Sequence, residues 1–333
     1  MNLGRRLVIA IGGNAILADG QKGTSEEQRA NLETACASIA PLLRPGVNAV
    51  ITHGNGPQVG NILVQNEAAR AEVPPQPLDV CGAQSQGSLG YLIQQTLARV
   101  LARRKAGREV VALVTQTVVS PDDPAFRAPA KPVGPYYREA EAQELSRDKG
   151  WTMKEVAKRR WRRVVASPEP LEIVERAMIR KLMRQGTVVI AAGGGGIPVT
   201  RSGGELSGIE AVIDKDLASA TLARDVGADT LIILTDIEKV ALDFGKPGER
   251  QLDRLTVTEA KKHLAEGQFP PGSMGPKIEA AIRFLSPRAE ASLDSFLEAG
   301  AKPPRSQLKV IITSLGGAPE AARGKTGTVV TPD

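Results

Sequence analysis

The sequence has 333 residues, of which 41% are hydrophobic and 34 are glycine, so it excludes disordered and fibrous proteins and predicts one large core or two lobes. Its formal net charge of +6 would suit nucleic acid, but arginine and lysine are spread along the chain, and aromatic residues, which stack on bases, make up only 3%. Small anionic substrates fit this charge better, and we expect no nucleic-acid partner.

Strand-like and helix-like patterns alternate along the chain, which predicts an α/β fold with a mainly parallel sheet and helices on its faces. The strand patterns are rich in Val, Ile and Leu with little polar alternation, as in sheets that are buried on both faces. In chain order, the sequence predicts a strand at 6–13, a helix at 25–43, a strand at 47–54, a helix at 87–104, a strand at 110–119, a helix at 171–186, strands at 187–196 and 230–236, a helix at 275–285 and a strand at 308–314.

Two segments depart from this alternation. Residues 120–170 are rich in proline at both ends and charged inside, which predicts an excursion from the sheet that is too polar to pack firmly. Residues 286–307 precede the last strand and predict a surface insertion, to which we assign no role.

Membrane spans and metal clusters are not predicted. The longest apolar runs, such as VVIAAGGGGIPV at 188–199, are interrupted by glycine well short of the roughly 20 residues that cross a bilayer. Cys36 and Cys81 are the only cysteines and there are two histidines, so neither a disulfide framework nor a zinc cluster is available. We expect a cytoplasmic protein with no membrane partner.

Glycine-containing turns follow three of the predicted strands. The first strand ends in Gly12, Gly13 and Asn14, the second in Gly54 and Asn55, and a later one in the run 193–196, which includes Gly194 and Gly195. Glycine permits positive φ and brings backbone N–H groups close to a phosphate, and a helix N-terminus adds partial positive charge. The alternative is that these glycines only make short strand-to-helix turns, but their shared position at the carboxyl ends of strands favours an anion site.

Charged residues in two further segments indicate phosphoryl transfer. Asp214, Lys215 and Asp216 lie where a strand pattern ends and a small-residue helical run begins, and Lys277 lies in the first turn of a predicted helix, where a cation is disfavoured unless an anion is near. The loop GxxxxGK[ST] and the spacing GxGxxG are both absent, so a nucleotide must be held in another way. Lysines suit a transferring phosphoryl group, although a solvated charged turn and a solvated lysine stay open as alternatives.

An ordered set of motifs resembles the carbamate kinases of the amino acid kinase superfamily over nearly the whole chain. The motifs are GGNAIL, THGNGPQVGNIL, DPAF, KPVGPYY, GGGGIPV, AVIDKDLAS, LIILTD, FGKP, GSMGPK and GTVV. The resemblance implies a single domain over residues 1–333 with a three-layer αβα sandwich, usually as a homodimer. It divides the chain into an N-terminal lobe on the carbamoyl phosphate side (1–205), which carries a protruding lid subdomain (120–168), and a C-terminal lobe on the nucleotide side (206–333).

The same resemblance implies the reaction ADP + carbamoyl phosphate ⇌ ATP + carbamate, with Mg²⁺ held chiefly through phosphates and water, so no metal ligand is assigned. Carried onto matching positions, the catalytic residues would be Lys131, Lys215, Asp216 and Lys277. The residues that receive the carbamoyl phosphate or its phosphoryl group would be Gly12, Gly13, Asn14, Gly54, Asn55, Gly194 and Gly195. The nucleotide would contact Thr235, Asp236, Phe244, Met274 and Lys277.

One feature of the residues themselves favours carbamate as the acceptor. Relatives such as acetylglutamate kinases carry a lysine on the first strand just before the glycines, whereas this chain has none between Arg6 and Gly12. The missing cation must come from elsewhere, and Lys131 in the excursion is the candidate, acting from a mobile lid. The resemblance is compatible both with ATP harvest from arginine or purine breakdown and with supply of carbamoyl phosphate.

The chain also departs from the family pattern within the excursion. The stretch AKRRWRRVV at 157–165 has three basic residues in place of small ones and Trp161 in place of tyrosine, which indicates a different lid hinge. We expect this basic stretch to be a solvated lid face, with recruitment of phosphate and binding of nucleic acid as the alternatives. A relative that phosphorylates another small carboxylate or a phosphonate is the alternative function. A catalytically silent regulatory or basic binding module is a third, and the intact set of three lysines and Asp216 argues against it.

Overall fold

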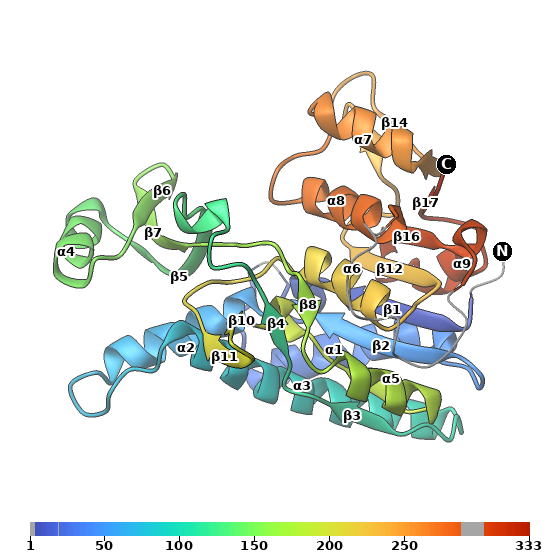
Figure 1. The fold of residues 1–333 in the computed structure, drawn as a ribbon, viewed down its shortest axis with the longest axis horizontal. Coiled ribbons are helices and arrows are strands. Elements are labelled where there is room, and N and C mark those ends of the chain that lie inside the picture. The colour runs from blue at the N-terminus through green and yellow to red at the C-terminus, as the bar shows by residue number, and fades with distance from the viewer. Residues whose placement is uncertain (1–3, 19, 288–302) are drawn as a thin grey trace.

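A mainly parallel eight-stranded sheet forms the centre of the computed structural model, which describes residues 4–18, 20–287 and 303–333 (Figure 1). All of its pairings are parallel except the antiparallel pair β16 and β17. From one edge to the other, the strands are β15 (Arg254–Thr256), β17 (Thr328–Thr331), β16 (Lys309–Ser314), β12 (Thr230–Thr235), β1 (Arg6–Ile11), β2 (Asn48–His53), β9 (Val188–Ile190) and β3 (Val110–Ala112).

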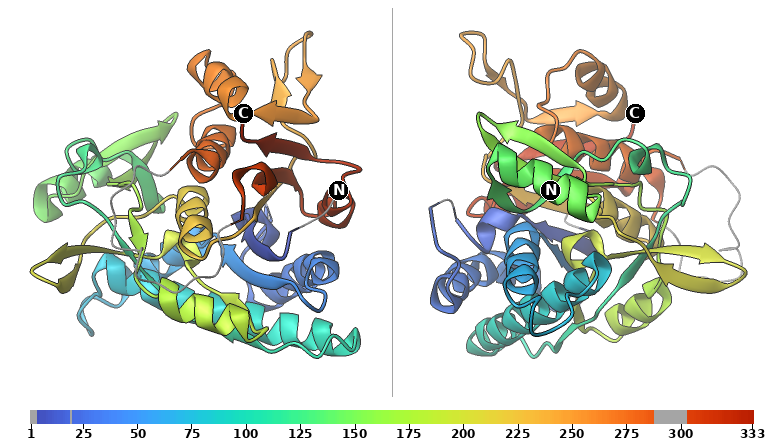
Figure 2. Two further views of the ribbon diagram at one scale, coloured as in Figure 1. Left: turned by 45° about the vertical axis from the view of Figure 1, so that its right-hand side comes forward. Right: turned by 90° about the vertical axis from the view of Figure 1, so that its left-hand side faces the viewer.

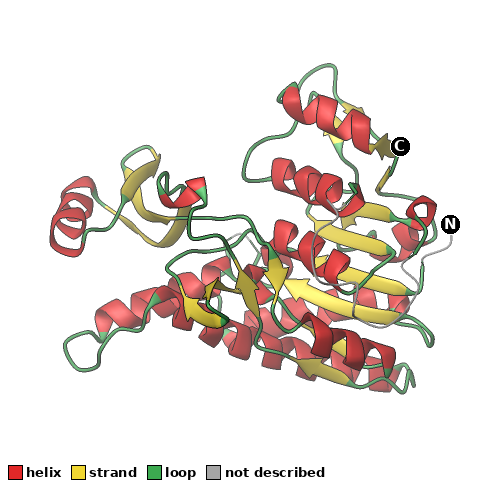
Figure 3. Cartoon of the chain, viewed as in Figure 1, coloured by secondary structure: helices red, strands yellow, loops and turns green. Residues whose placement is uncertain are grey.

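Helices cover both faces of this sheet, and β1 shows why. Successive side chains of a strand point to opposite faces, so Leu7 and Ile9 join one hydrophobic core while Val8 and Ala10 join the other. The first core includes residues of α1 (Ser25–Ile39), α3 (Leu78–Arg103) and α9 (Ala318–Ala322), and the second includes residues of α5 (Arg176–Arg184), α6 (Lys215–Asp225), α7 (Val257–Ala265) and α8 (Met274–Leu285). The predicted αβα sandwich is therefore confirmed (Figure 3).

A smaller four-stranded sheet lies beside the main one. Its strands, in order, are β11 (Glu205–Gly208), β10 (Ile197–Ser202), β4 (Gln116–Val118) and β8 (Glu172–Ile173). The single strand predicted over 110–119 was wrong, because the chain leaves the main sheet after β3 and enters the smaller one at β4. The hydrogen bonds of the buried Gln86 side chain with the backbone of Thr115 hold the connection between the two strands.

The excursion predicted over 120–170 is present, and it is better packed than expected. It carries η3 (Pro124–Phe126), α4 (Glu139–Lys149) and a three-stranded antiparallel sheet of β5 (Lys131–Tyr137), β7 (Arg160–Val165) and β6 (Met153–Ala157). This lid projects from one side of the body (Figures 1 and 2). Its polar composition misled the prediction of loose packing, because Val133, Val165 and Ala142 are buried.

Several helix boundaries differ from the predicted ones. The helix predicted at 87–104 begins at Leu78, and the helix predicted at 171–186 begins at Arg176, because the preceding residues form β8. The first helix begins as predicted at Ser25 with a capping box between Thr24 and Glu27. It ends at Ile39, and η2 (Ala40–Leu42) follows.

The remaining elements are α2 (Gly56–Ala68), the hairpin of β13 (Ala241–Leu242) and β14 (Arg250–Gln251), and the short helices η1 (Gly13–Ala15), η4 (Gly193–Gly195) and η6 (Arg305–Gln307). Most of the predicted insertion, residues 288–302, lies outside the described residues. The division into two lobes stays a prediction. No helix in the described part of the chain is both long enough and apolar enough to cross a membrane.

Candidate functional site

The first two glycine turns lie together at the carboxyl ends of the central strands β1 and β2. Because β1 and β2 are parallel neighbours, the turns that follow them lie side by side. The approach is so close that a Cβ added to Gly54 would lie 3.1 Å from the backbone nitrogen of Gly13. The expectation that these glycines serve positive φ was wrong for Gly12, Gly13 and Gly54, none of which has positive φ. Close backbone packing explains Gly54 instead.

The third turn does use positive φ, with values of 65°, 96° and 89° at Gly194, Gly195 and Gly196. It is also tightly packed. A Cβ on Gly194 would collide with the side-chain amide of Asn55, and one on Gly195 would lie 2.6 Å from the carbonyl oxygen of Ile213. The turn therefore joins the second glycine turn to the segment that leads into α6.

The N-terminus of α2 faces this region without a side-chain cap. Asn55 is the N-cap residue, but its side chain donates to the hydroxyl of Ser85 at 2.7 Å and makes no capping hydrogen bond. The first turn of a helix carries unpaired N–H groups and partial positive charge, which attract an anion. An uncapped 13-residue helix whose N-cap side chain is turned aside is well suited to a phosphate.

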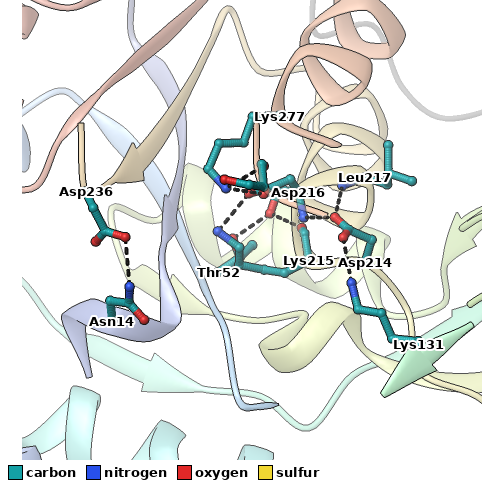
Figure 4. Close-up of polar contacts among 11 residues, drawn as sticks. Asn14, Thr52, Lys131, Asp214, Lys215, Asp216, Leu217, Asp236 and Lys277 are labelled. Carbon is teal, nitrogen blue, oxygen red and sulfur yellow. Dashed lines mark hydrogen bonds and ion pairs between the residues drawn. The ribbon is translucent and has the colours of Figure 1, made fainter. Parts of the chain in front are cut away.

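Asp216 lies between two lysines at the start of α6 (Figure 4). Its carboxylate is 2.7 Å from the ammonium of Lys215 and 3.1 Å from that of Lys277, and their side chains are only 6%, 13% and 16% exposed. Burial alone would raise the pKa of Asp216, but the two ammonium groups outweigh it and lower the pKa. The cluster carries two positive charges and one negative charge at pH 7, so a net positive charge is available for phosphates.

This contact also accounts for Lys277, the fourth residue of α8, near the positive end of the helix. Its ammonium contacts Asp216 and lies 3.4 Å from the carbonyl oxygen of Ser273, so it is not a loosely solvated lysine. The carboxylate supplies the negative charge that the sequence led us to expect from a bound anion.

Asp214 has a separate role that the sequence analysis missed. It is the N-cap of α6, where its carboxylate accepts from the backbone N–H of Asp216 and Leu217, and it pairs with the ammonium of Lys131 at 3.1 Å (Figure 4). No strand ends at this triplet, contrary to expectation, and the approach includes an isolated bridge between Ala211 and Ala166. An aspartate directly before a helical run is an N-cap signal that would have identified Asp214.

A cleft of about 600 Å³ brings many of the predicted residues together. The predicted residues that line it are Gly54, Asn55, Lys131, Gly194, Lys215 and Asp216. Arg162, which the sequence analysis did not single out, also lines the cleft, and its guanidinium donates to the carbonyl oxygen of Gly134 at 2.7 Å. Gly12, Gly13, Asn14, Gly195 and Lys277 are not part of its lining, although Lys277 reaches it through Asp216.

A second cavity, of about 120 Å³, contains the four residues predicted only for the nucleotide. Thr235, Asp236, Phe244 and Met274 all line it, together with Phe269 and neighbouring residues. Asn14 donates to Asp236 at 2.8 Å, so the first glycine turn is tied to this cavity (Figure 4). Phe244 is 58% exposed, which leaves an aromatic face accessible to a planar base.

Among the described residues, no group of three or more His, Cys, Asp or Glu side chains could hold a metal ion. The two carboxylates in the cleft, Asp214 and Asp216, already pair with lysines. These residues do not form a cage of oxygen ligands for Mg²⁺.

Comparisons with known proteins agree with the geometry. The sequence model of the amino acid kinase family matches residues 5–288. The carbamate kinase of Pyrococcus horikoshii is 49% identical over 98% of this chain and 99% of that protein, and the carbamate kinase of Pyrococcus furiosus is 48% identical over 99% and 100%. The structure of carbamate kinase from Giardia lamblia bound to AMP-PNP is 42% identical, with a TM-score of 0.87 over 100% of both chains. The resemblance seen in the ordered motifs is confirmed, and the chain belongs to the carbamate kinases of the amino acid kinase family.

Proposed function

We propose that this chain catalyses the reversible transfer of a phosphoryl group between carbamoyl phosphate and ADP. The observation that carries the proposal is the buried Lys215–Asp216–Lys277 cluster, which adjoins a cleft lined by two glycine turns. An oxygen of the ADP β-phosphate forms a bond to the phosphorus, and the bond from phosphorus to the carbamoyl oxygen breaks. The products are ATP and carbamate, which decomposes to ammonia and CO₂.

Catalysis would be electrostatic. The transition state of phosphoryl transfer spreads negative charge over three equatorial oxygens, so positioning and positive charge do most of the work. Lys215 and Lys277 supply the charge on the nucleotide side. Asp216 holds both ammonium groups in place before substrate arrives, which removes reorganisation from the reaction step. Backbone N–H groups at Gly12, Gly13 and Asn55 would receive the transferring group from the opposite side, with Asn14 alongside. The N–H of Gly54 is not available for this role, because it donates to the carbonyl oxygen of Ile11 at 3.1 Å.

Lys131 would serve the carbamoyl phosphate. It begins β5 in the lid, and its ammonium is held by Asp214 across the cleft. An incoming dianion would compete with Asp214 for this ammonium, so the lysine would move from the carboxylate to the substrate. Closure of the lid around the substrate would also exclude water from the labile carbamoyl group.

The nucleotide would occupy the cavity lined by Thr235, Asp236, Phe244 and Met274. The relative from Giardia lamblia bound to AMP-PNP supports an adenine nucleotide as the second substrate. We propose that Mg²⁺ enters with the nucleotide and is coordinated mainly by phosphate oxygens and water, because Mg²⁺ loses its bound water reluctantly.

The N-terminal lobe (1–205) with the lid (120–168) would bind carbamoyl phosphate, and the C-terminal lobe (206–333) would bind the nucleotide. We also propose a homodimer. Within the described residues, β3 is an edge strand of the main sheet, and Tyr91 and Val114 beside it are more than half exposed. The two buried free thiols, Cys36 and Cys81, fit a reducing compartment such as the cytoplasm.

A substrate panel tests the reaction. Initial rates of ATP formation from Mg·ADP are measured with carbamoyl phosphate, acetyl phosphate and the acyl phosphate of an N-acylated amino acid. The concentration of each phosphoryl donor is varied over a range that spans its KM. The proposal predicts the highest kcat/KM for carbamoyl phosphate. A higher value for another acyl phosphate would favour a family relative with a different acceptor, and no ATP from any of them would favour a silent binding module.

A further inference from the structure

His53 is a buried polar residue to which the proposed mechanism assigns no part. It is the last residue of β2, directly before the second glycine turn, and it is 1% exposed. A buried imidazole is unfavourable unless its polar atoms are paired, so its presence at this position requires an explanation.

The hydrogen bond of His53 identifies its tautomer. The ring Nδ1 lies 2.9 Å from the carbonyl oxygen of Gly54. A carbonyl oxygen only accepts, so Nδ1 carries the proton and donates. Burial lowers the pKa of His53 to about 4, and the neighbouring charge of Lys215 contributes in the same direction. The ring is therefore neutral at pH 7, with its proton on Nδ1.

This hydrogen bond fixes the peptide group between Gly54 and Asn55. In a trans peptide the C=O and the N–H point in opposite directions. Because the Gly54 carbonyl points toward the buried ring, the N–H of Asn55 points away from the ring, and both residues line the cleft. The N–H of Gly54 is also engaged, since it donates to the carbonyl oxygen of Ile11 at 3.1 Å. Within the described chain, the N–H of Asn55 has no protein acceptor.

The ring also has little freedom to turn. A Cβ added to Gly193 would collide with Nε2 of His53 and would lie 3.3 Å from Cγ of Gln86. The third glycine turn therefore closes over the ring, and the ring separates the two turns at a fixed distance. Glycine at 193 is explained by this contact and not by backbone conformation, because Gly193 has no positive φ.

We propose that His53 is a positioning residue that aims the Asn55 N–H at the transferring phosphoryl group by holding the Gly54 carbonyl on the opposite side of the peptide. The inference rests on the proposed function for the identity of the anion. Without the donor at Nδ1, the peptide of a glycine, which has few conformational restrictions, is free to rotate and can present a carbonyl oxygen to the phosphate. A misdirected donor costs about 10²-fold in kcat, as loss of one preorganised N–H does.

Two substitutions separate the hydrogen bond from packing. In His53→Asn, the amide nitrogen occupies nearly the position of Nδ1 and keeps the donor, but it leaves a larger void. In His53→Leu, the volume is better preserved and the donor is lost. The proposal predicts that His53→Leu lowers kcat with carbamoyl phosphate about 10²-fold and leaves ADP affinity within about threefold of the wild-type value. His53→Asn should keep kcat within about fivefold of the wild-type value. Leu97→Ala, in the core of α3 away from the cleft, serves as a control for loss of stability alone.

If His53 served packing alone, kcat would fall more in His53→Asn than in His53→Leu, or equally in both, and either result would overturn the proposal.

A second readout does not depend on the reaction. The ¹H–¹⁵N amide signal of Asn55 is followed during titration with inorganic phosphate, in the wild type and in His53→Leu. The signal should shift in the wild type and not in the variant. An equal shift in both would overturn the proposal, whereas a wild type that binds phosphate but makes no ATP would contradict only the proposed function.

Discussion

Replacing Asp216 with asparagine removes the carboxylate that Lys215 and Lys277 share, while it keeps nearly the same shape. Asparagine cannot neutralise an ammonium group, so two buried positive charges lose their partner. Breaking a buried ion pair by removing one partner costs about 3–5 kcal/mol. A chain of 333 residues has an unfolding entropy of about 0.7 kcal/mol/K at about 2.1 cal/mol/K per residue, so Tm should fall by about 4–7 °C.

The pH dependence of this loss has a defined sign. The pKa of Asp216 is lowered in the folded chain, because the two ammonium groups outweigh the effect of burial. Its contribution to stability is therefore present above the pKa of an unfolded aspartate, about 3.9, and is lost as pH falls through the lower folded pKa. The gap in Tm between the wild type and Asp216→Asn should be constant from about pH 8 to pH 5 and should narrow in more acidic buffer.

Thermal unfolding, followed by circular dichroism, measures this gap with and without saturating Mg·ADP. Nucleotide phosphates would supply negative charge to the two lysines, so ADP should recover part of the lost Tm. Turnover should also fall, because the lysines are no longer held in place. A Tm within 1 °C of the wild type at pH 7, or a kcat above about a third of the wild-type value, which corresponds to less than 1 kcal/mol of transition-state stabilisation, would refute the assigned role of Asp216.

The remaining predictions concern the lid, the N-cap and the third glycine turn. Lys131→Ala should lower kcat/KM for carbamoyl phosphate about 10²-fold and leave ADP affinity within about threefold, and Lys131→Arg should restore only part of the lost kcat/KM. Steady-state kinetics and ADP titration measure the two effects, and an equal loss for both substrates would place Lys131 on the nucleotide. Asp214→Asn keeps a good N-cap, so Tm should change by less than about 2 °C. It also removes the ion pair with Lys131, so the KM for carbamoyl phosphate should fall about threefold. A raised KM would contradict competition between Asp214 and the substrate for Lys131. Gly194→Ala places a side chain at a residue with positive φ and against Asn55, so the free energy of unfolding, measured with urea, should fall by about 1–3 kcal/mol. An unchanged free energy of unfolding would contradict the described packing.

The sequence predicted the central sheet well because buried parallel strands are continuous apolar runs that need no knowledge of their neighbours. It failed where the chain changes sheets. Residues 110–119 read as one strand, and only the tertiary position of Gln86 explains why they divide into β3 and β4. The lid shows the same limit, since a polar segment hides a small sheet whose few buried valines are far apart in sequence.

The candidate site was predictable in composition but not in pairing. The lysines, Asp216 and the glycine turns could be named from motifs, whereas the division of labour between Asp214 and Asp216 depends on distances that spacing does not set. His53 carries almost no sequence signal, because a lone histidine at the end of a strand is usually a packing residue. Its relation to the Gly54 carbonyl and to Gly193 appears only in three dimensions.

Phosphorus NMR of the complete reaction tests the central claim most directly. The wild-type chain is mixed with carbamoyl phosphate, ADP and Mg²⁺, and the same mixture is followed with Lys215→Met, which has a similar length but no charge. The proposed function predicts that the signal of carbamoyl phosphate disappears while the γ-phosphate signal of ATP grows with the wild type, and that the variant shows almost no conversion. No ATP signal from the wild type, or equal conversion by both proteins, would contradict it.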